Sequence, residues 1–355
     1  MAIQKQKFGV MPDGREAALY TITNLHGLSA SFSELGAVWV NMLVPDRDGK
    51  LDDILLGYDN MDGYLRNGPH FGAVVGRVAN RTGGAAFTLK GKSYHLQKNN
   101  GENNLHSGLD FFEKRFWASR VCEEENSVTF TLESPDNDQG FPGNASISVC
   151  YRLTEEDCVE ITYQASCDQA TPMNLTNHAY FNLGGHDSGS VCGHRVRILS
   201  GFFTPSFADS IPTGEILSVG GTPMDFREEK EVGLEIDADD LQMKQAGGYD
   251  HNWCLEHEAG TCGMAASAFH PESGRYMEVL TDLPGIQFYT GNFLKEEGGK
   301  NGAFYGKRSG MCFETQFYPD SLNKAWFPSP ILQAGERFQS VTCYRFGVRM
   351  PFGAV

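Results

Sequence analysis

Residues 127–133 read Ser-Val-Thr-Phe-Thr-Leu-Glu, and polar and apolar side chains alternate along them with a period of two. Residues 146–153, Ser-Ile-Ser-Val-Cys-Tyr-Arg-Leu, repeat the pattern. Strict alternation puts the apolar side chains on one face of an extended chain, which is typical of a half-buried β-strand. The two runs therefore predict strands that each press one face against a core.

Outward from these runs, the sequence shows strand patterns in both directions and few helical ones. Further strands are expected at Val159 to Tyr163 and at residues 195–198, 277–280, 286–289 and 338–346. The 41 glycines and 15 prolines fall between such runs, where they mark turns. Short helices are expected at residues 59–65, 239–245 and 319–324, with acidic residues at their starts acting as N-caps.

No linker, repeat or low-complexity run divides the chain, and the strand pattern extends from about Ala17 to Phe346. Many short strands at close spacing indicate a sandwich or a barrel. We therefore expect an all-β fold in which residues 1–355 form one large β-sandwich domain with few short helices. A sandwich of that size can curve and hold a ligand on its concave face.

Charge and composition exclude several kinds of partner. The 29 basic and 45 acidic residues give a net charge of −16, which repels nucleic acid and anionic membrane surfaces. No apolar run reaches the ~18–20 residues of a membrane span, and the N-terminus lacks the apolar segment of a secretory signal. The nine cysteines are scattered without metal-binding spacing, which predicts reduced thiols and a cytoplasmic protein.

Two segments combine residues suited to proton transfer. Residues 173–185, Met-Asn-Leu-Thr-Asn-His-Ala-Tyr-Phe-Asn-Leu-Gly-Gly, place His178 between asparagines and aromatics, a combination suited to binding a sugar. Residues 311–320 place Glu314 in an apolar, strand-like run. A carboxylate in such surroundings has a raised pKa unless it is paired, as a general base working near neutral pH requires.

Four more polar segments have both a functional and a structural interpretation. They contain Arg77 and Arg81 in residues 76–84, His106 in 99–108, Asp250 in 247–253, and Gln287 in 284–292. Surface ion pairs, hydrogen-bonded turns and a satisfied buried glutamine would explain them equally well. A metal site is less favoured because the histidines and carboxylates lie far apart without HxH or HExxH spacing, and no GxSxG motif indicates a serine nucleophile.

Taken together, these segments resemble the galactose mutarotase, or aldose 1-epimerase, family. The motifs follow the family's order from about residue 17 to 347, and they are Gly-Arg-Val-Ala-Asn-Arg (76–81), Asn-Leu-His (104–106), Asn-Leu-Thr-Asn-His-Ala-Tyr-Phe-Asn-Leu (174–183), Tyr-Asp-His-Asn (249–252), Pro-Gly-Ile-Gln-Phe-Tyr-Thr-Gly-Asn (284–292) and Phe-Glu-Thr-Gln (313–316).

The resemblance implies a single β-sandwich with an open sugar cleft and no cofactor. Glu314 would remove the proton from the anomeric hydroxyl, and His178, titrating near ~6.5, would protonate the ring oxygen. His106 would lie near that ring oxygen. Sugar hydroxyls would be bound by Asn80, Arg81, Asp250 and Gln287.

The sequence departs from the family pattern at two positions. Ser107 stands where glycine is common, and His70 stands where an aromatic residue commonly precedes Phe-Gly-Ala. Both put fine substrate preference in question, because His70 could face the cleft. Three functions stay open: a mutarotase acting on free aldohexoses such as galactose and glucose, an epimerase of sugar phosphates, and a non-catalytic sugar-binding module. The protein is expected to be a monomer or a homodimer.

Overall fold

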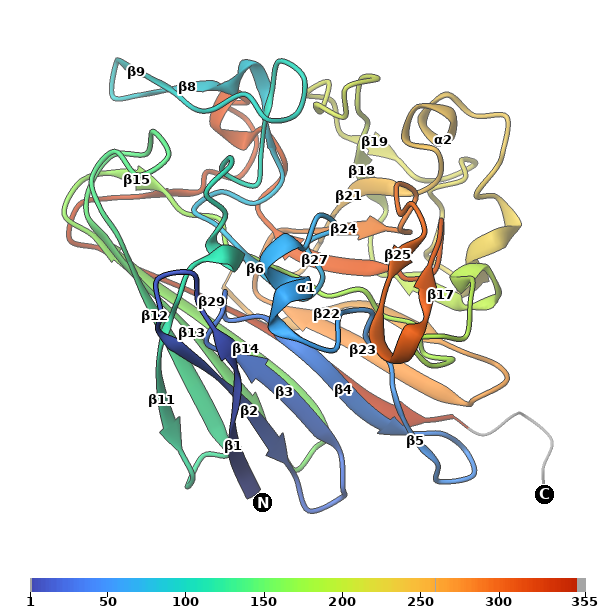
Figure 1. Ribbon diagram of the computed structural model, residues 1–355. Coiled ribbons are helices and arrows are strands. Elements are labelled where there is room, and N and C mark those ends of the chain that lie inside the picture. Colours follow the sequence, from blue (N-terminus) through green and yellow to red (C-terminus); the bar gives the residue numbers. More distant parts are fainter. Residues whose placement is uncertain (1, 259, 350–355) are drawn as a thin grey trace.

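A nine-stranded antiparallel sheet is the largest element of the structure, a computed structural model that describes residues 2–258 and 260–349 (Figure 1). Its strands, in spatial order, are β11 (Ala118–Cys122), β12 (Ser127–Ser134), β13 (Ala145–Leu153), β14 (Cys158–Cys167), β29 (Arg337–Val348), β23 (Arg275–Thr281), β22 (Gly263–Phe269), β17 (Arg195–Ile198) and β20 (Lys230–Glu231). The two strands predicted from alternation are confirmed as the neighbours β12 and β13, with Phe130 opposite Val149.

Two five-stranded sheets accompany it. The first contains β1 (Ala2–Val10), β2 (Glu16–Thr23), β3 (Ser29–Ser33), β4 (Trp39–Pro45) and β5 (Leu51–Asp53) in chain order. The second has the order β19 (Leu217–Ser218), β18 (Phe202–Thr204), β21 (Asp250–Cys254), β24 (Gly285–Tyr289) and β27 (Cys312–Gln316). Segments far apart in sequence thus meet in the second sheet.

Short two-stranded ribbons carry many of the loops above the sheets. They pair β6 (Ala73–Val75) with β16 (Thr176–His178), β7 (Arg81–Thr82) with β10 (Asn104–Leu105), β8 (Ala86–Leu89) with β9 (Lys92–His95), β15 (Thr171–Pro172) with β28 (Ile331–Leu332), and β25 (Glu297–Gly298) with β26 (Phe304–Tyr305).

Within the described residues, helical structure is confined to two short α-helices and six 3₁₀ turns. The α-helices are α1 (Met61–Arg66) and α2 (Leu241–Ala246), and the 3₁₀ turns are η1 (Gly83–Ala85), η2 (Phe112–Lys114), η3 (Val191–Gly193), η4 (Val232–Leu234), η5 (Lys300–Gly302) and η6 (Ser321–Asn323). An acidic residue caps α2, but it is Asp240 rather than Asp239 at the expected start, and Asn60 rather than an acidic residue caps α1. The third expected helix is only the turn η6. No helix in the described ranges is long and apolar enough to cross a membrane.

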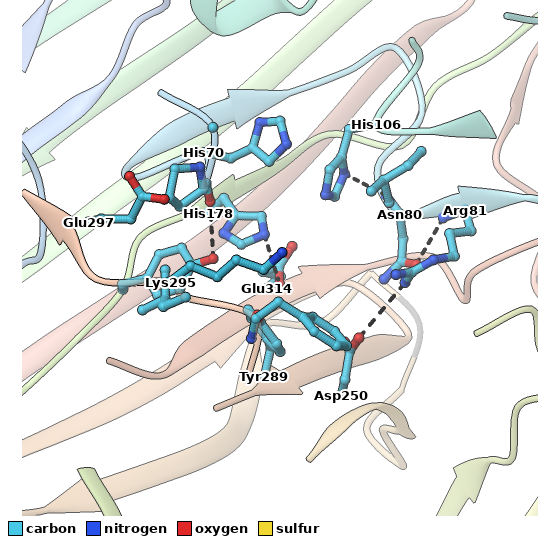
Figure 2. Close-up of a pocket in the computed structure, with 16 residues that line it drawn as sticks. His70, Asn80, Arg81, His106, His178, Asp250, Tyr289, Lys295, Glu297 and Glu314 are labelled. Carbon is cyan, nitrogen blue, oxygen red and sulfur yellow. Dashed lines mark hydrogen bonds and ion pairs between the residues drawn. The ribbon is translucent and has the colours of Figure 1, made fainter. Parts of the chain in front are cut away.

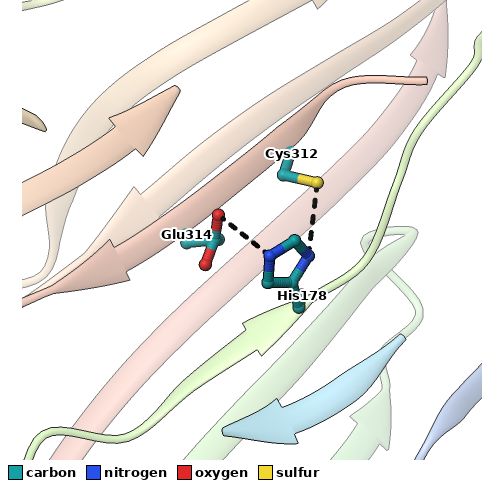
Figure 3. Close-up of side chains that lie close together, drawn as sticks. All are labelled: His178, Cys312 and Glu314. Carbon is teal, nitrogen blue, oxygen red and sulfur yellow. Dashed lines mark hydrogen bonds and ion pairs between the residues drawn. The ribbon is translucent and has the colours of Figure 1, made fainter. Parts of the chain in front are cut away.

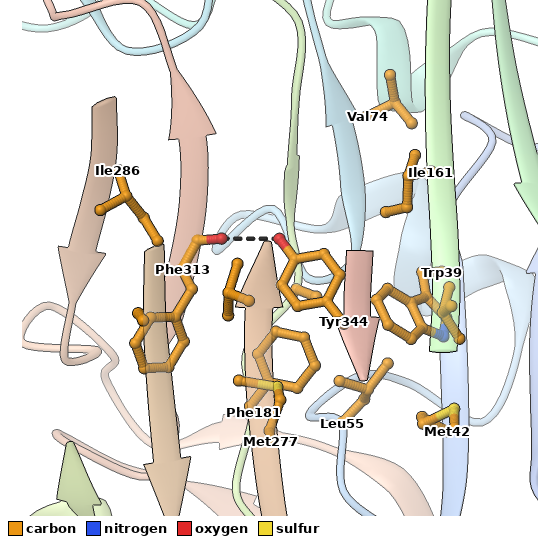
Figure 4. Packing of buried hydrophobic residues seen from close by; sticks show 14 of the residues in the cluster. Trp39, Met42, Leu55, Val74, Ile161, Phe181, Met277, Ile286, Phe313 and Tyr344 are labelled. Atoms are coloured by element: carbon orange, nitrogen blue, oxygen red, sulfur yellow. Dashed lines mark hydrogen bonds between the residues drawn. The ribbon is translucent and has the colours of Figure 1, made fainter. Parts of the chain in front are cut away.

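The core lies between the nine-stranded sheet and the two smaller ones. Tyr344 of β29 contacts Trp39 of β4 at 5.6 Å between ring centroids, and its hydroxyl donates to the carbonyl of Phe313 of β27 at 2.7 Å (Figure 4). Since one residue touches both five-stranded sheets, both cover the same face of the large sheet. Phe32 and Tyr151 stack at 4.1 Å in the same apolar cluster. The expected all-β sandwich is confirmed.

One pair of cysteines differs from the expectation of reduced thiols. Cys158 of β14 and Cys343 of β29 form a disulfide between adjacent strands, and the other seven cysteines are free. Sequence spacing gave no sign of this pair because its members are 185 residues apart and meet only through the strand register.

Arg77 connects the loops to the large sheet. Its side chain is 1% exposed, and its guanidinium donates to six acceptors. These acceptors are the Ser134 hydroxyl and carbonyl, the Pro135, Pro142 and Gly143 carbonyls, and the Thr171 hydroxyl, at 2.8–3.1 Å. Arg77 therefore holds the connection between β12 and β13 against the segment that follows β6.

Replacing Arg77 with methionine should lower the free energy of unfolding by about 3 kcal/mol or more. The change leaves several buried acceptors without donors. Each unsatisfied buried acceptor costs up to about 1–3 kcal/mol of folding free energy. Urea denaturation followed by fluorescence measures the change. Arg120→Met, at an exposed arginine on β11, is the matched control and should stay within about 0.5 kcal/mol of wild type. Equal stability of the two variants would contradict the structural role of Arg77.

Two buried histidines, His194 and His251, are held uncharged. Burial lowers the pKa of His194 to about 3, with His270 adding to the effect, and lowers the pKa of His251 to about 4. Nε2 of His194 accepts the backbone N–H of Leu183 at 3.0 Å, and Nδ1 of His251 accepts that of Asp250 at 3.2 Å. Protonation of either nitrogen would break the bond that it accepts.

Stability should therefore fall as the pH drops from about 6.5 toward 4. In that window the unfolded histidines bind protons and the folded ones do not, so each contributes a slope of at most about 1.4 kcal/mol per pH unit. His194→Gln keeps a hydrogen-bond acceptor and should flatten the slope, whereas His95→Gln, at an exposed histidine, should leave it unchanged. Urea midpoints at pH 7, 6, 5 and 4.5 test this, and a stability that rises on acidification would rule it out.

Candidate active site

The alternation of strand β27 determines which of its side chains leave the core. Phe313 packs in the apolar cluster, and the hydroxyl of Thr315 bonds to that of Thr342 on β29 at 2.5 Å. Because successive side chains of a strand point to opposite faces, Glu314 points away from the large sheet. On β24, which pairs with β27 so that Gln287 lies opposite Glu314, the same alternation places Gln287 and Tyr289 on that outer face.

A cavity of about 400 Å³ lies over this outer face (Figure 2). Its walls come from loops far apart in the sequence: Gly68, Pro69, His70, Asn80, Arg81, Leu105, His106, His178, Tyr180, Asp250, Tyr289, Phe293, Leu294, Lys295, Glu297 and Glu314. Six of the seven site residues expected from the sequence are in this wall, and Gln287 is not. Imidazoles, carboxylates, a guanidinium and aromatic rings are the groups that bind polyhydroxylated ligands.

Glu314 and His178 lie together in the floor of the cavity. Nε2 of His178 is 3.6 Å from Oε1 of Glu314, and both side chains are buried. His178 ends β16, whose pairing with β6 fixes its backbone opposite Ala73, and its ring stacks on Tyr180 at 5.1 Å between centroids. The distance is longer than a good hydrogen bond, so each group is free to bind a ligand atom.

Burial shifts both of these groups toward their uncharged forms. Burial, assisted by the Asp250 charge and opposed by Arg81, raises the pKa of Glu314 well above its usual value. Burial, assisted by His70, lowers the pKa of His178 to about 3. The expectation of a raised carboxylate pKa is confirmed, but that of an imidazole titrating near ~6.5 is wrong, because His178 is buried to a depth that residue type and spacing do not reveal.

Cys312 completes a cluster whose residue types would suit a metal ion, but its arrangement does not. Sγ of Cys312 is 3.5 Å from Nδ1 of His178, whereas Glu314 lies at Nε2 (Figure 3). The sulfur and the carboxylate are thus on opposite edges of the ring, and one ion cannot use the imidazole together with both of them. Burial raises the pKa of the Cys312 thiol well above its usual value, so it stays protonated.

Asp250 and Arg81 form the other end of the cavity. Nη1 of Arg81 is 3.9 Å from Oδ2 of Asp250, and Nε of Arg81 donates to Asn100 at 3.1 Å. Gln287 lies behind them and donates its amide to Oδ1 of Asp250 at 2.7 Å. It therefore orients the carboxylate, and direct contact of Gln287 with a ligand stays a prediction.

His106 and Asn80 are joined by two hydrogen bonds, one of which reaches the imidazole of His106. The N–H of Asn80 donates to Nδ1 of His106 at 3.1 Å, and the N–H of His106 donates to the Asn80 carbonyl at 3.0 Å. Burial, assisted by the charges of His70 and His178, lowers the pKa of His106 well below its usual value. Since Nδ1 accepts a hydrogen bond, the neutral ring carries its hydrogen on Nε2, which makes that nitrogen a donor.

Several neighbouring residues proved structural. Phe181 packs in the core while Tyr180 lines the cavity. The amides of Asn174 and Asn177 bond to the carbonyls of Phe317 and Gly72, and these bonds hold the loop in place. Ser107 is buried and bonds through its hydroxyl to the backbone of Val78, outside the cavity wall.

Sequence reasoning missed the loop at residues 293–297 and Tyr289 as parts of the wall. The position of Tyr289 two residues after Gln287 on one strand was a usable signal, since both share a face. Lys295 and Glu297 had no such signal, because no alternation or motif marks their loop.

Comparison with known proteins identifies the family. The family model for aldose 1-epimerase matches residues 18–345. The chain is 42% identical to galactose mutarotase of Bos taurus over 351 residues, which cover 98% of this chain and 99% of that one. It is 37% identical to aldose 1-epimerase of Escherichia coli K12 over 337 residues, covering 94% and 96%. A crystal structure of an aldose epimerase homologue from C. elegans matches with a TM-score of 0.86 at 30% identity, covering 93% and 98%. With that fold, and with this cavity at its outer face, the chain belongs to the aldose 1-epimerase family.

Proposed function

We propose that this protein is an aldose 1-epimerase that interconverts the α and β anomers of free aldohexoses such as galactose and glucose. The observation that carries the proposal is the pair formed by Glu314 and His178, 3.6 Å apart in the floor of a polar cavity. Two proton-transfer groups at that spacing suit the anomeric hydroxyl O1 and the ring oxygen O5, which are bonded to the same carbon.

In the proposed reaction, Glu314 removes the proton from O1 while Nε2 of His178 donates a proton to O5. The O1 lone pair forms the carbonyl, and the electrons of the C1–O5 bond go to O5. The open-chain aldehyde rotates about C1–C2, and the O5 hydroxyl attacks the other carbonyl face while both proton transfers reverse. No cofactor takes part in these steps.

The two residues hold one proton between them throughout this cycle. The ring-closed complex needs an ionised Glu314 and a protonated His178, and ring opening converts them to a carboxylic acid and a neutral imidazole. Burial favours that second, uncharged arrangement, which agrees with the raised pKa of Glu314 and the lowered pKa of His178. The buried surroundings thus favour the residue pair that accompanies the open-chain sugar.

The other wall residues fit the binding of hydroxyls. The Asp250 carboxylate is an acceptor for sugar hydroxyls, held by Arg81 on one oxygen and Gln287 on the other. His106 is suited to donate from Nε2, and Asn80 fixes its ring.

A sugar phosphate is the less favoured substrate. Arg77, one of the two arginines available in the site segments, donates all its bonds to structural acceptors, and Arg81 pairs with Asp250. Besides Arg81, Lys295 is the other lysine or arginine of the cavity wall, and Glu297 lies in the same loop. A phosphate would require more positive charge than this.

The proposal extends to the organisation of the protein. We propose that residues 1–355 form a single domain. One apolar cluster that includes both Ala18 and Phe346 supports this. A cytoplasmic location and a monomeric or dimeric state stay predictions from the sequence.

The protein should accelerate the change in optical rotation of freshly dissolved α-D-galactose and α-D-glucose. Galactose 6-phosphate should react much more slowly, because the cavity wall lacks a cluster of basic side chains. Polarimetry of the three sugars side by side tests this. A rate equal to that of buffer for all three would reject the activity, and preference for the phosphate would favour the sugar-phosphate epimerase.

Glu314→Gln and His178→Asn should each lower kcat by about 10²–10⁴-fold, since each change removes one proton-transfer group. Both replacements are similar in shape, so the circular dichroism spectrum should be unchanged. Glu124→Gln, at an exposed glutamate, is the matched control and should keep wild-type turnover. Near-normal kcat in either site variant would show that its assigned role is wrong.

A further inference from the structure

The cavity contains a third imidazole, His70, to which the proposed reaction assigns no role. Its ring centroid is 5.1 Å from that of His106 and 5.9 Å from that of His178, and Phe111 packs against it edge-on at 4.8 Å. It precedes β6 with a φ of +65°, a left-handed conformation uncommon for residues other than glycine. Figure 2 shows it on the same side of the cavity as the two other histidines.

A buried carboxylate holds this ring. Both oxygens of Glu113 lie near Nδ1 of His70, at 2.8 and 2.9 Å, and Glu113 is 1% exposed. Within the described ranges the carboxylate has no other hydrogen-bond donor. A buried carboxylate accepts hydrogen bonds wherever it can, so Nδ1 of His70 carries a hydrogen and donates it to Glu113.

The turn that carries Glu113 is itself anchored. Gly36 approaches so closely that a Cβ at this position would lie 2.2 Å from the Glu113 carbonyl oxygen, and its N–H donates to the Arg115 carbonyl at 2.8 Å. Nε1 of Trp117 donates to the Phe112 carbonyl at 3.0 Å. Glu113 is therefore a fixed acceptor, and His70 is fixed with it.

The second nitrogen of His70 is left for a ligand. His70 belongs to the cavity wall, and Nε2 has no partner in the described part of the chain. This nitrogen is also not fully buried, and because His70 lines the cavity, a ligand there can approach it. Whether the ring is neutral or protonated, Nε2 can form a hydrogen bond with a hydroxyl, as acceptor or as donor.

We propose that His70 is a substrate-binding residue whose Nε2 hydrogen-bonds to a hydroxyl on C2, C3, C4 or C6 of the sugar, and that Glu113 positions it. The proposal rests on the proposed function and adds a specificity contact to the same site. An aromatic residue that only filled space at this position would not need a buried carboxylate at its far edge, since burying that charge is costly.

The test pairs His70→Phe with sugars that lack single hydroxyls. Initial mutarotation rates give kcat/KM for galactose and for its 2-, 3-, 4- and 6-deoxy analogues, in wild type and variant. We expect a roughly 10-fold loss for galactose, the size of one hydrogen bond to a charged or polar group, and no loss for the one analogue that lacks the partner hydroxyl. Unchanged kcat/KM on galactose, or an equal loss on all five sugars, would overturn the proposal.

Two further variants separate positioning from folding. His70→Phe leaves the Glu113 carboxylate buried without its hydrogen-bond donor, which could destabilise the fold. The double variant His70→Phe with Glu113→Gln removes the carboxylate charge as well. It should show the same pattern across the analogues as His70→Phe, and Glu113→Gln alone should raise KM more than it lowers kcat. A double variant with wild-type selectivity would contradict the proposal, as would a Glu113→Gln variant with wild-type KM. His95→Phe, at an exposed histidine, is the control.

Calorimetric titration of galactose separates this proposal from the proposed function. If wild type binds galactose but does not speed mutarotation, the proposed function fails, and the ratio of Kd values between wild type and variant still tests His70. If wild type is active and both proteins have equal Kd and KM, only the His70 proposal fails. No binding by wild type overturns both.

Discussion

Strand β27 can present Glu314 to a ligand because the residues on either side of it are held against the large sheet. Phe313 accepts a hydrogen bond from Tyr344 at its carbonyl, and Thr315 bonds to Thr342. A shift of one residue in register would move Glu314 into the apolar core and Phe313 into the cavity, so core packing specifies the position of the carboxylate. The same register places Gln287 opposite Glu314 and lets it hold Asp250 from behind.

The protonation of Glu314 depends on its burial and on the charges of Asp250 and Arg81. Asp250 raises the pKa of Glu314 and Arg81 lowers it, so the carboxylate is affected by a nearby ion pair of opposite charges. Because the pair cancels most of its own field at a distance, burial is left as the main cause of the raised pKa. The arginine that would serve a phosphate is thereby engaged, and the cavity suits uncharged, hydroxyl-rich ligands.

The sequence predicted the strands, which follow from the periodicity of apolar residues. It did not predict how deeply individual side chains are buried. Strands β12 and β13 follow from alternation alone, since a half-buried strand must alternate. Arg77 and Arg81 lie four residues apart in one segment, yet Arg77 donates mainly to buried backbone carbonyls and Arg81 lines the cavity. The lowered pKa of His178 and the Cys158–Cys343 disulfide likewise need three-dimensional packing, which no spacing in the sequence encodes.

Three residues of the cavity wall hold strained backbone conformations. His70, Asn80 and His106 have φ values of +65°, +62° and +52°, in the left-handed region where a side chain costs about 1–3 kcal/mol. Such conformations persist only when their surroundings fix them, and here each has a specific hold. Glu113 binds the ring of His70, and Asn80 and His106 exchange two hydrogen bonds. The bonds that maintain the strain also fix the Nδ1 edges of His70 and His106, which leaves the Nε2 edges free. A site that must distinguish sugar hydroxyls by position gains from this rigidity, because its groups lose little freedom when the ligand binds.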